Sequence, residues 1–200
     1  NNKMDFNLSE EHKLIRETVR DFAEREVKPL AKDLDEKGEF SIELTKKIGE
    51  LGLFGMYLPE KYDGGGMDTL SYIIAVEEMA RIDSSQAATL AAHNSLGIGP
   101  IYYFGSEEQK MKYLPKLCTG NHLWGFGLTE PDAGSDLGVV QTRATFDEQT
   151  ETWHLNGVKR FITNGNADVH VILARSEGGS SDARGLSLFL IERDDSVRIR

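Results

Sequence analysis

The sequence predicts an α+β fold, with an N-terminal all-α helical domain over residues 1–120 and a small antiparallel β-barrel or sandwich domain over residues 121–200. Three observations predict this fold. Apolar residues recur with a period of about 3.6 before Gly120 and a period of about two after it. Short runs rich in β-branched and aromatic residues follow Gly120, separated by turn residues. No helix-length stretch separates these runs, which argues against a sheet built from βαβ units.

The first helix is predicted from an apolar stripe bounded by a residue that caps helices and a residue that ends them. Its buried face should consist of Ile15, Val19, Phe22, Ala23 and Val27. Ser9 is expected to cap the first turn. Pro29 is expected to end the helix because proline has no N–H for the helical hydrogen bond.

Four further helices complete the predicted helical domain. One runs from Ser41 to Gly52, where glycine tolerates the left-handed conformation of a helix end. Two more are predicted over residues 69–82 and 84–104. Ser106, with Gln109 three residues further on, predicts a capping box for a short helix that ends at Pro115.

The predicted strands of the second domain come from alternating or β-rich runs. "VQTRATF" alternates as a half-exposed strand does, and Asn156-Gly157 lies between two strand-like runs, which favours a hairpin. "DVHVILARS" and "GLSLFLIER" read as two more strands, joined by the loop "EGGSSDAR". The final "DDSVRIR" reads as a strand that begins but is not completed. We therefore expect the domain to be cut before its end.

Composition and charge exclude several classes of protein. A formal net charge of −10 and a pI near 5.0 argue against nucleic-acid binding, which needs a basic face. No apolar run approaches the roughly 18 residues of a membrane span. The chain starts without the features of a secretory signal, so we expect a protein that is not secreted. The single cysteine, Cys118, fits a reducing compartment and reads as a buried apolar residue.

The segment "GLTEPDAGSD", Gly127 to Asp136, is unusually polar for one that follows the apolar run "LWGF". It is not a nucleophile elbow, because Ala133 stands where a glycine must precede Ser135. It is not a calcium loop, because Arg143 occupies the position of the bidentate glutamate. Near-matches to the dinucleotide fingerprint lack their third glycine. The five histidines show no zinc spacing, so no metal site is predicted.

Two interpretations of this segment remain open on the residues alone. Thr129 and Ser135 offer hydroxyl donors, Gly134 permits close approach of a ligand, and Pro131 stiffens the turn. A large polar ligand would suit such a loop. Alternatively, Thr129 and Asp132 close local turns within an ordinary connection.

Two segments resemble a known family. "FGLTEPDAGSD" and "NGVKRFITNGNADV" resemble the flavin-contacting segments of the acyl-CoA dehydrogenases, and the similarity extends over most of the chain, with short-chain and branched-chain types nearest. The resemblance implies FAD-dependent α,β-dehydrogenation of acyl-CoA thioesters to trans-2-enoyl-CoA. Hydride would pass to N5 of FAD, and electrons would pass on to an electron-transfer flavoprotein. It also implies a C-terminal helical bundle after the β domain.

The resemblance implies a set of cofactor-binding residues: Phe126, Leu128, Thr129, Gly134, Ser135, Phe161, Ile162 and Thr163. Thr129 should lie at the pyrimidine edge of the flavin and Thr163 near N5. Ser135 should also lie along the substrate's pantetheine arm or the FAD phosphates. Phe161 stands where many relatives have tryptophan, which keeps an aromatic face but loses an N–H donor. Without the resemblance, Phe126 and Phe161 read as core aromatics and Thr163 as part of a turn.

No catalytic residue is expected within these 200 residues, since the family's glutamate base belongs to the later helical domain. Glu130 reads instead as a structural acceptor for backbone donors. The resemblance further implies a homotetramer or homodimer in the bacterial cytoplasm or the mitochondrial matrix. Alternatives are an acyl-CoA oxidase or flavin monooxygenase on the same fold, or a non-catalytic relative that acts in assembly.

Overall fold

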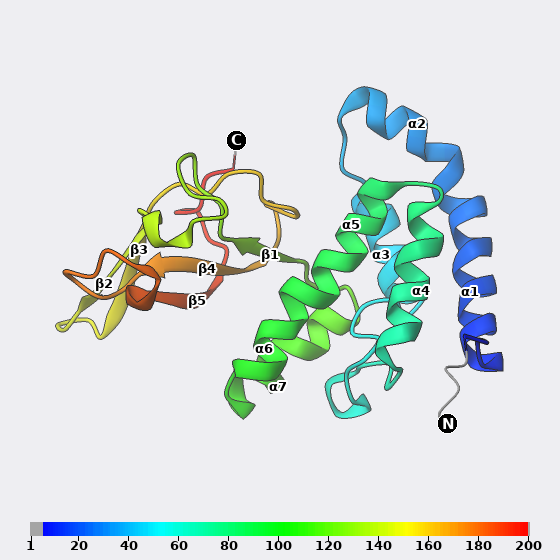
Figure 1. Ribbon diagram of the computed structural model, residues 1–200, viewed down its shortest axis with the longest axis horizontal. Helices are drawn as coiled ribbons and strands as arrows, with labels where there is room; N and C mark the ends of the chain where they lie inside the picture. The colour runs from blue at the N-terminus through cyan, green and yellow to red at the C-terminus, as the bar shows by residue number, and fades with distance from the viewer. Residues whose placement is uncertain (1–5, 200) are drawn as a thin grey trace. The chain divides into compact units, whose positions relative to one another are not determined.

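The computed structural model describes residues 6–199, and these fall into two compact units, residues 6–121 and 122–199 (Figure 1). The first unit contains the α-helices α1 Glu10–Phe22, α2 Lys28–Lys37, α3 Ile42–Glu50, α4 Thr69–Ala80, α5 Ser84–Ala92, α6 Gly99–Phe104 and α7 Glu107–Cys118. The second contains the strands β1 Trp124–Gly127, β2 Arg143–Asp147, β3 Thr152–Asn156, β4 Val169–Arg175 and β5 Leu186–Glu192. The predicted α+β class is therefore confirmed.

The predicted helix starts are confirmed by their capping contacts. The Ser9 hydroxyl accepts a hydrogen bond from the His12 N–H at 3.2 Å. Ser41 caps α3 in the same way, and Ser106 and Gln109 form both bonds of a capping box at the start of α7. The predicted buried face is also confirmed, since Ile15, Val19, Phe22, Ala23 and Val27 are all buried.

The two helix ends predicted at prolines are wrong. Residues Ala23–Val27 form a π-helical turn between α1 and α2, and Pro29 lies in the first turn of α2, where no N–H is needed. Pro115 lies inside α7, which continues to Cys118 because Leu114, Leu117 and Cys118 are buried. A second π-helical turn, His93–Ile98, separates α5 from α6 within the long predicted helix over residues 84–104.

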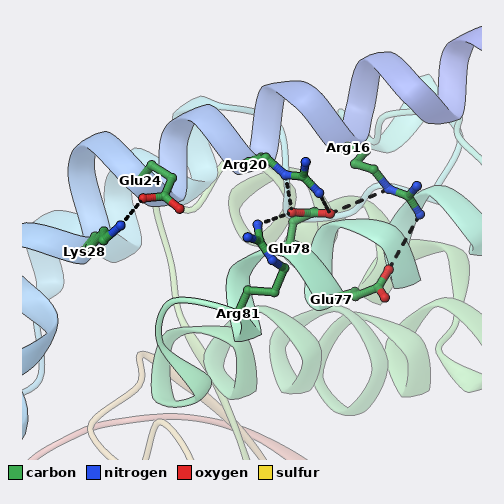
Figure 2. Close-up of polar contacts among 7 residues, drawn as sticks. All are labelled: Arg16, Arg20, Glu24, Lys28, Glu77, Glu78 and Arg81. Carbon is green, nitrogen blue, oxygen red and sulfur yellow. Dashed lines mark hydrogen bonds and ion pairs between the residues drawn. The ribbon is translucent and has the colours of Figure 1, made fainter.

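A buried carboxylate joins α1 to α4, which run side by side (Figure 1). Only 3 % of the Glu78 side chain is exposed, and its oxygens accept two bonds from Arg20, at 2.8 and 2.9 Å. Arg81 donates at 2.9 Å, and Arg16 forms a longer ion pair at 3.6 Å (Figure 2). These cationic partners offset the cost of burying the Glu78 carboxylate, which would be strongly destabilising if it were left without them.

The sheet is mixed, which corrects the prediction of a purely antiparallel domain. β2 with β3 and β4 with β5 pair antiparallel, but β1 and β2 both run parallel to β4. The hairpin predicted at Asn156-Gly157 is also wrong. β3 ends at Asn156, and the tight turn lies instead between β2 and β3, at residues 148–151.

β4 is the strand from which the rest of the sheet is built. β5 pairs along its whole length on one edge. On the other edge, β1 pairs with the stretch from Val169 to Ile172, and β2 pairs only at Arg175, opposite Arg143. The chain therefore leaves this edge at the end of β1 and returns to it three residues further along β4. Everything between, residues 128–142, is a loop with both ends held on one strand.

Candidate functional site

The polar segment that follows β1 is part of the loop formed by residues 128–142, which folds back onto β4. We call this loop the signature loop. Ala133 and Val140 turn inward and pack against Leu173 of β4, with Leu128 and Leu137 at the margin of this small core. The Arg175 side chain donates to the carbonyl oxygens of Gly138 and Val140, at 2.7 and 3.3 Å. The loop is therefore a folded structure that exposes a short tip, residues 131–136 with the exception of Ala133.

Glu130 closes the signature loop on itself. Its carboxylate accepts hydrogen bonds from the N–H groups of Gln141 and Thr142, at 2.7 and 3.0 Å, and from the Thr142 hydroxyl. Lys159 donates a further bond at 2.8 Å. Burial by itself would raise the pKa of Glu130, but these hydrogen bonds outweigh it and hold that pKa at about 2. The interpretation of Glu130 as a structural acceptor is confirmed.

A second segment, residues 157–166, runs beside β1 and the start of the signature loop. The Arg160 N–H donates to the Thr129 carbonyl at 2.8 Å, and Lys159 Nζ donates to the Leu128 carbonyl at 3.0 Å. At the other end of β1, a Cβ on Gly125 would lie only 3.0 Å from the Asn164 carbonyl oxygen. Residues 161–163 lie between these two attachments, so the structure brings the two predicted ligand-binding segments together.

The residues predicted on the first segment differ in their surroundings. Phe126 is half-buried in β1, with its ring stacked on Trp124 at a centroid distance of 5.6 Å. Leu128 and Thr129 are half-buried where the loop begins, and Leu128 also contributes to the small core. Gly134 and Ser135 are exposed at the tip, and no hydrogen bond within residues 6–199 joins them to the second segment.

On the second segment, Phe161 is not the core aromatic that its residue type favours. Its side chain is 82 % exposed, and its φ of 57° places a bulky residue in the left-handed region. The Arg160 guanidinium lies 4.7 Å from the ring centroid. Ile162 is half-buried and Thr163 is exposed. An exposed ring on a strained backbone is typical of a surface that another molecule covers.

The donors of this site fit a flat aromatic ligand with polar edges, such as a flavin. In the part of the chain that the structure describes, the hydroxyls of Thr129, Ser135 and Thr163 take part in no hydrogen bond. These three groups are therefore available to a ligand, while the half-buried Phe126 and the exposed Phe161 offer apolar faces. The same described range contains no group of three or more His, Cys, Asp or Glu side chains arranged to hold a metal ion.

An open hollow of about 410 Å³ lies on the signature loop but is not formed by the predicted cofactor-binding residues. Its lining consists of Glu130, Pro131, Asp132, Gln141, Thr142, Arg143, Asn156, Gly157 and Val158. None of the eight predicted residues belongs to this set. The uncommitted hydroxyls and the exposed Phe161, rather than this hollow, define the candidate site.

Three residues shape the site but are not predicted from the sequence: Lys159, Arg160 and Arg175. A lysine or arginine in a polar run usually lies on a solvated surface, and the sequence does not show that Lys159 is partly buried. Lys159 and Arg160 do fall within the resembling segment "NGVKRFITNGNADV", which was the one available signal. Arg175 lies within the predicted strand "DVHVILARS", and nothing in the sequence indicates that its side chain binds the loop.

The fold and site together define a class of protein: a helical unit followed by a β unit whose two joined segments offer hydroxyls and aromatic faces that fit a large, flat, polar-edged cofactor. Two family models match the chain, the acyl-CoA dehydrogenase N-terminal domain over residues 9–121 and the acyl-CoA dehydrogenase middle domain over residues 125–200. The chain belongs to the acyl-CoA dehydrogenase family, which confirms the resemblance.

Individual relatives agree with this assignment. The short-chain specific acyl-CoA dehydrogenase of Clostridium acetobutylicum is 45 % identical over 191 residues, 95 % of this chain and 50 % of that protein. An acyl-CoA dehydrogenase of Bacillus anthracis, solved in complex with FAD, has a TM-score of 0.86 and 40 % identity, covering 96 % of this chain and 33 % of that one.

A third similar protein comes from the structure described as the electron transferring flavoprotein of Acidaminococcus fermentans. That chain has a TM-score of 0.90 and 43 % identity, covering 95 % of this chain and 50 % of that chain. This chain spans about half the length of the curated relatives that it matches. No helix in residues 6–199 has the length and apolar character needed to cross a membrane.

Proposed function

We propose that the protein to which this chain belongs is an FAD-dependent acyl-CoA dehydrogenase that converts acyl-CoA thioesters to trans-2-enoyl-CoA. The observation that carries the proposal is the joining of the two segments, by the hydrogen bond from Arg160 N–H to the Thr129 carbonyl at 2.8 Å. Family membership and the FAD complex of the Bacillus anthracis relative support the same cofactor. When bound, FAD accepts the hydride that leaves the β-carbon of the substrate.

The residues of this chain would hold and polarise the cofactor. Phe126, Leu128, Phe161 and Ile162 would pack along the ring. The Thr129 hydroxyl would donate to its pyrimidine edge, where negative charge gathers on reduction, and Thr163 would donate near the hydride-accepting nitrogen. Gly134 and Ser135 would lie along the cofactor phosphates, with Ser135 also near the pantetheine arm of acyl-CoA.

The proton from the α-carbon must go to a base, and we assign that role to no residue of this chain. Glu130 is unsuited to it, because its buried carboxylate is held by Lys159 and by donors from Gln141 and Thr142. Such a carboxylate binds a proton weakly, as its pKa of about 2 indicates. The base would be a glutamate of a further helical domain, outside these 200 residues.

The remaining parts of the proposal concern partners. Electrons would pass to an electron-transfer flavoprotein, in the bacterial cytoplasm or the mitochondrial matrix. The similarity to a chain in the Acidaminococcus fermentans structure supports this kind of partner. The full protein would be a homotetramer or homodimer, with a helical domain over residues 1–120 and a β domain that begins at residue 121.

An anaerobic titration of the full-length protein tests this proposal. We expect the purified protein to show a flavin absorption band near roughly 450 nm. Acyl-CoAs of graded length should bleach this band, most strongly at the chain length that the protein oxidises best. Rapid return of the band in air without an electron-transfer flavoprotein would favour an oxidase or monooxygenase instead. A protein that binds no flavin, or whose flavin no acyl-CoA bleaches, would contradict the proposal.

A further inference from the structure

Lys159 is a partly buried cation that links the two segments of the site. Its side chain is 10 % exposed and that of Glu130 is 5 % exposed, with their charged atoms 2.8 Å apart. The same Nζ donates to the Leu128 carbonyl at 3.0 Å. The aliphatic part of the side chain passes over β1, where a Cβ on Gly127 would lie 3.2 Å from Lys159 Cγ.

The surroundings of Glu130 show that Lys159 is not needed merely to satisfy this carboxylate. Glu130 already accepts bonds from the Gln141 and Thr142 N–H groups and from the Thr142 hydroxyl, all within the signature loop. These donors close the loop without help from the second segment. Lys159 adds a side-chain connection from this carboxylate to the second segment.

Lys159 also immediately precedes the residues that face the site. Arg160 follows it and bonds to the Thr129 carbonyl at 2.8 Å, and Phe161 then turns outward with its φ of 57°. Two adjacent residues thus attach the second segment to three consecutive residues of the first, Leu128, Thr129 and Glu130. This attachment fixes how far residues 161–163 lie from Thr129.

We propose that Lys159 is a positioning residue for the flavin. Its paired contacts with the Leu128 carbonyl and Glu130 hold the Thr163 and Thr129 hydroxyls at the separation that one bound ring requires. This inference rests on the proposed function. It differs from a purely stabilising ion pair, which would affect unfolding but not the affinity for FAD.

The test compares two variants of the full-length protein, K159M and R20M. Each removes one cation from a buried carboxylate that keeps other donors, since Glu78 retains Arg81 when Arg20 is lost (Figure 2). FAD dissociation constants are measured by the fluorescence of released FAD, and hydrogen exchange of residues 157–166 is followed in the apoprotein. We expect K159M to weaken FAD binding about tenfold or more, because bonds to charged groups are the stronger ones.

R20M should leave FAD binding within about twofold of wild type while lowering the unfolding temperature. In K159M, but not in R20M, residues 157–166 should exchange faster. K159R, which keeps the charge and its donors, should restore binding at least in part. If K159M does not fold, K159Q replaces it, since a shorter neutral amide cannot reach both acceptors.

FAD binding and exchange that match wild type in K159M or K159Q would overturn the positioning role and leave the proposed function intact. A wild-type protein that binds no FAD would overturn both. A lowered unfolding temperature alone, with unchanged FAD affinity, would show that the ion pair only stabilises the fold.

Discussion

Glu130 illustrates at the scale of one residue how a loop rich in turn residues becomes a fixed structure. Its carboxylate gathers donors from the far end of its own loop, at Gln141 and Thr142, and from Lys159. Replacing it with alanine would leave the partly buried Lys159 cation with only the Leu128 carbonyl as a partner. We expect Glu130→Ala to lower the free energy of unfolding by about 3–5 kcal/mol in denaturant titrations of the full-length protein. A loss below about 1 kcal/mol would contradict this account.

The pH dependence of stability provides a second test of Glu130. Its folded pKa, about 2, lies below the ordinary value of 4.5, so its contribution is complete above that value and is lost as the pH falls toward 2. The stability difference between wild type and Glu130→Gln should therefore shrink as the pH falls from about 5. His93, whose pKa burial lowers to about 4, also titrates in this range but does so in both proteins.

Gly157 marks a position where the backbone of the second segment approaches the signature loop closely. A Cβ there would lie 2.7 Å from Thr142 Cα and would overlap the Thr142 hydroxyl that binds Glu130. Gly157→Ala should cost about 1–3 kcal/mol of unfolding free energy through overpacking. Gly178→Ala is the matched control, because nothing lies within 4 Å of its Cβ position. Equal unfolding midpoints for the two variants would refute the prediction.

The sequence predicts some of these residue roles and not others, for a physical reason. Glu130 could be interpreted as an acceptor because the donors it needs are common in a turning loop near it in the chain. Lys159 could not, because its partners, Leu128 and Glu130, are about 30 residues away and only the fold brings them near. The exposure of the Phe161 side chain could not be predicted from its residue type either, since aromatic side chains near strands are usually buried.

At the scale of helices, starts were predicted better than ends. A helix start depends on local contacts such as the Ser106 and Gln109 capping box, which the sequence displays directly. The helix ends predicted at Pro29 and Pro115 do not occur, because residues close to each proline are buried in the helical unit. The π-helical turn Ala23–Val27 carries its two buried residues, Ala23 and Val27, into the core, and α7 buries residues on both sides of its proline.

One buried amide side chain, that of Asn94, connects the second π-helical turn to the chain around residues 53–56. Asn94 in His93–Ile98 accepts from the Met56 N–H and donates to the carbonyls of Leu53 and Leu90, at 2.8 and 3.0 Å. Asn94→Asp has nearly the same shape but turns a buried donor into a charged acceptor facing those carbonyls. We expect a loss of about 3 kcal/mol or more in unfolding free energy. Ser95→Ala, an exposed neighbour, should stay within about 0.5 kcal/mol.

Strands were located more reliably than they were paired. β4 and β5 were both predicted, and a short loop between them favours the antiparallel pairing that is observed. The parallel pairing of β1 with β4 joins Trp124 to Val169, residues far apart in the chain. No local pattern encodes such a contact, which explains why the sheet was predicted as wholly antiparallel.

At the scale of the whole molecule, the chain corresponds to about half of its curated relatives. The candidate site exposes the Phe161 ring and three uncommitted hydroxyls, so a cofactor held by these residues alone would stay open to water. We expect the isolated 200-residue chain to bind FAD far more weakly than the full-length protein, as measured by fluorescence titration of both. Equal affinities would show that this half of the protein is sufficient for the cofactor.

The attachment of the signature loop to a single strand has a consequence for substitutions in its tip. Because β1 and β2 leave and rejoin the same edge of β4, the strand register is set outside the loop tip. Of the tip residues 131–136, only Ala133 is buried. Substitutions at the exposed tip positions should therefore alter ligand recognition without unfolding the sheet, whereas a larger residue at Ala133 should affect both.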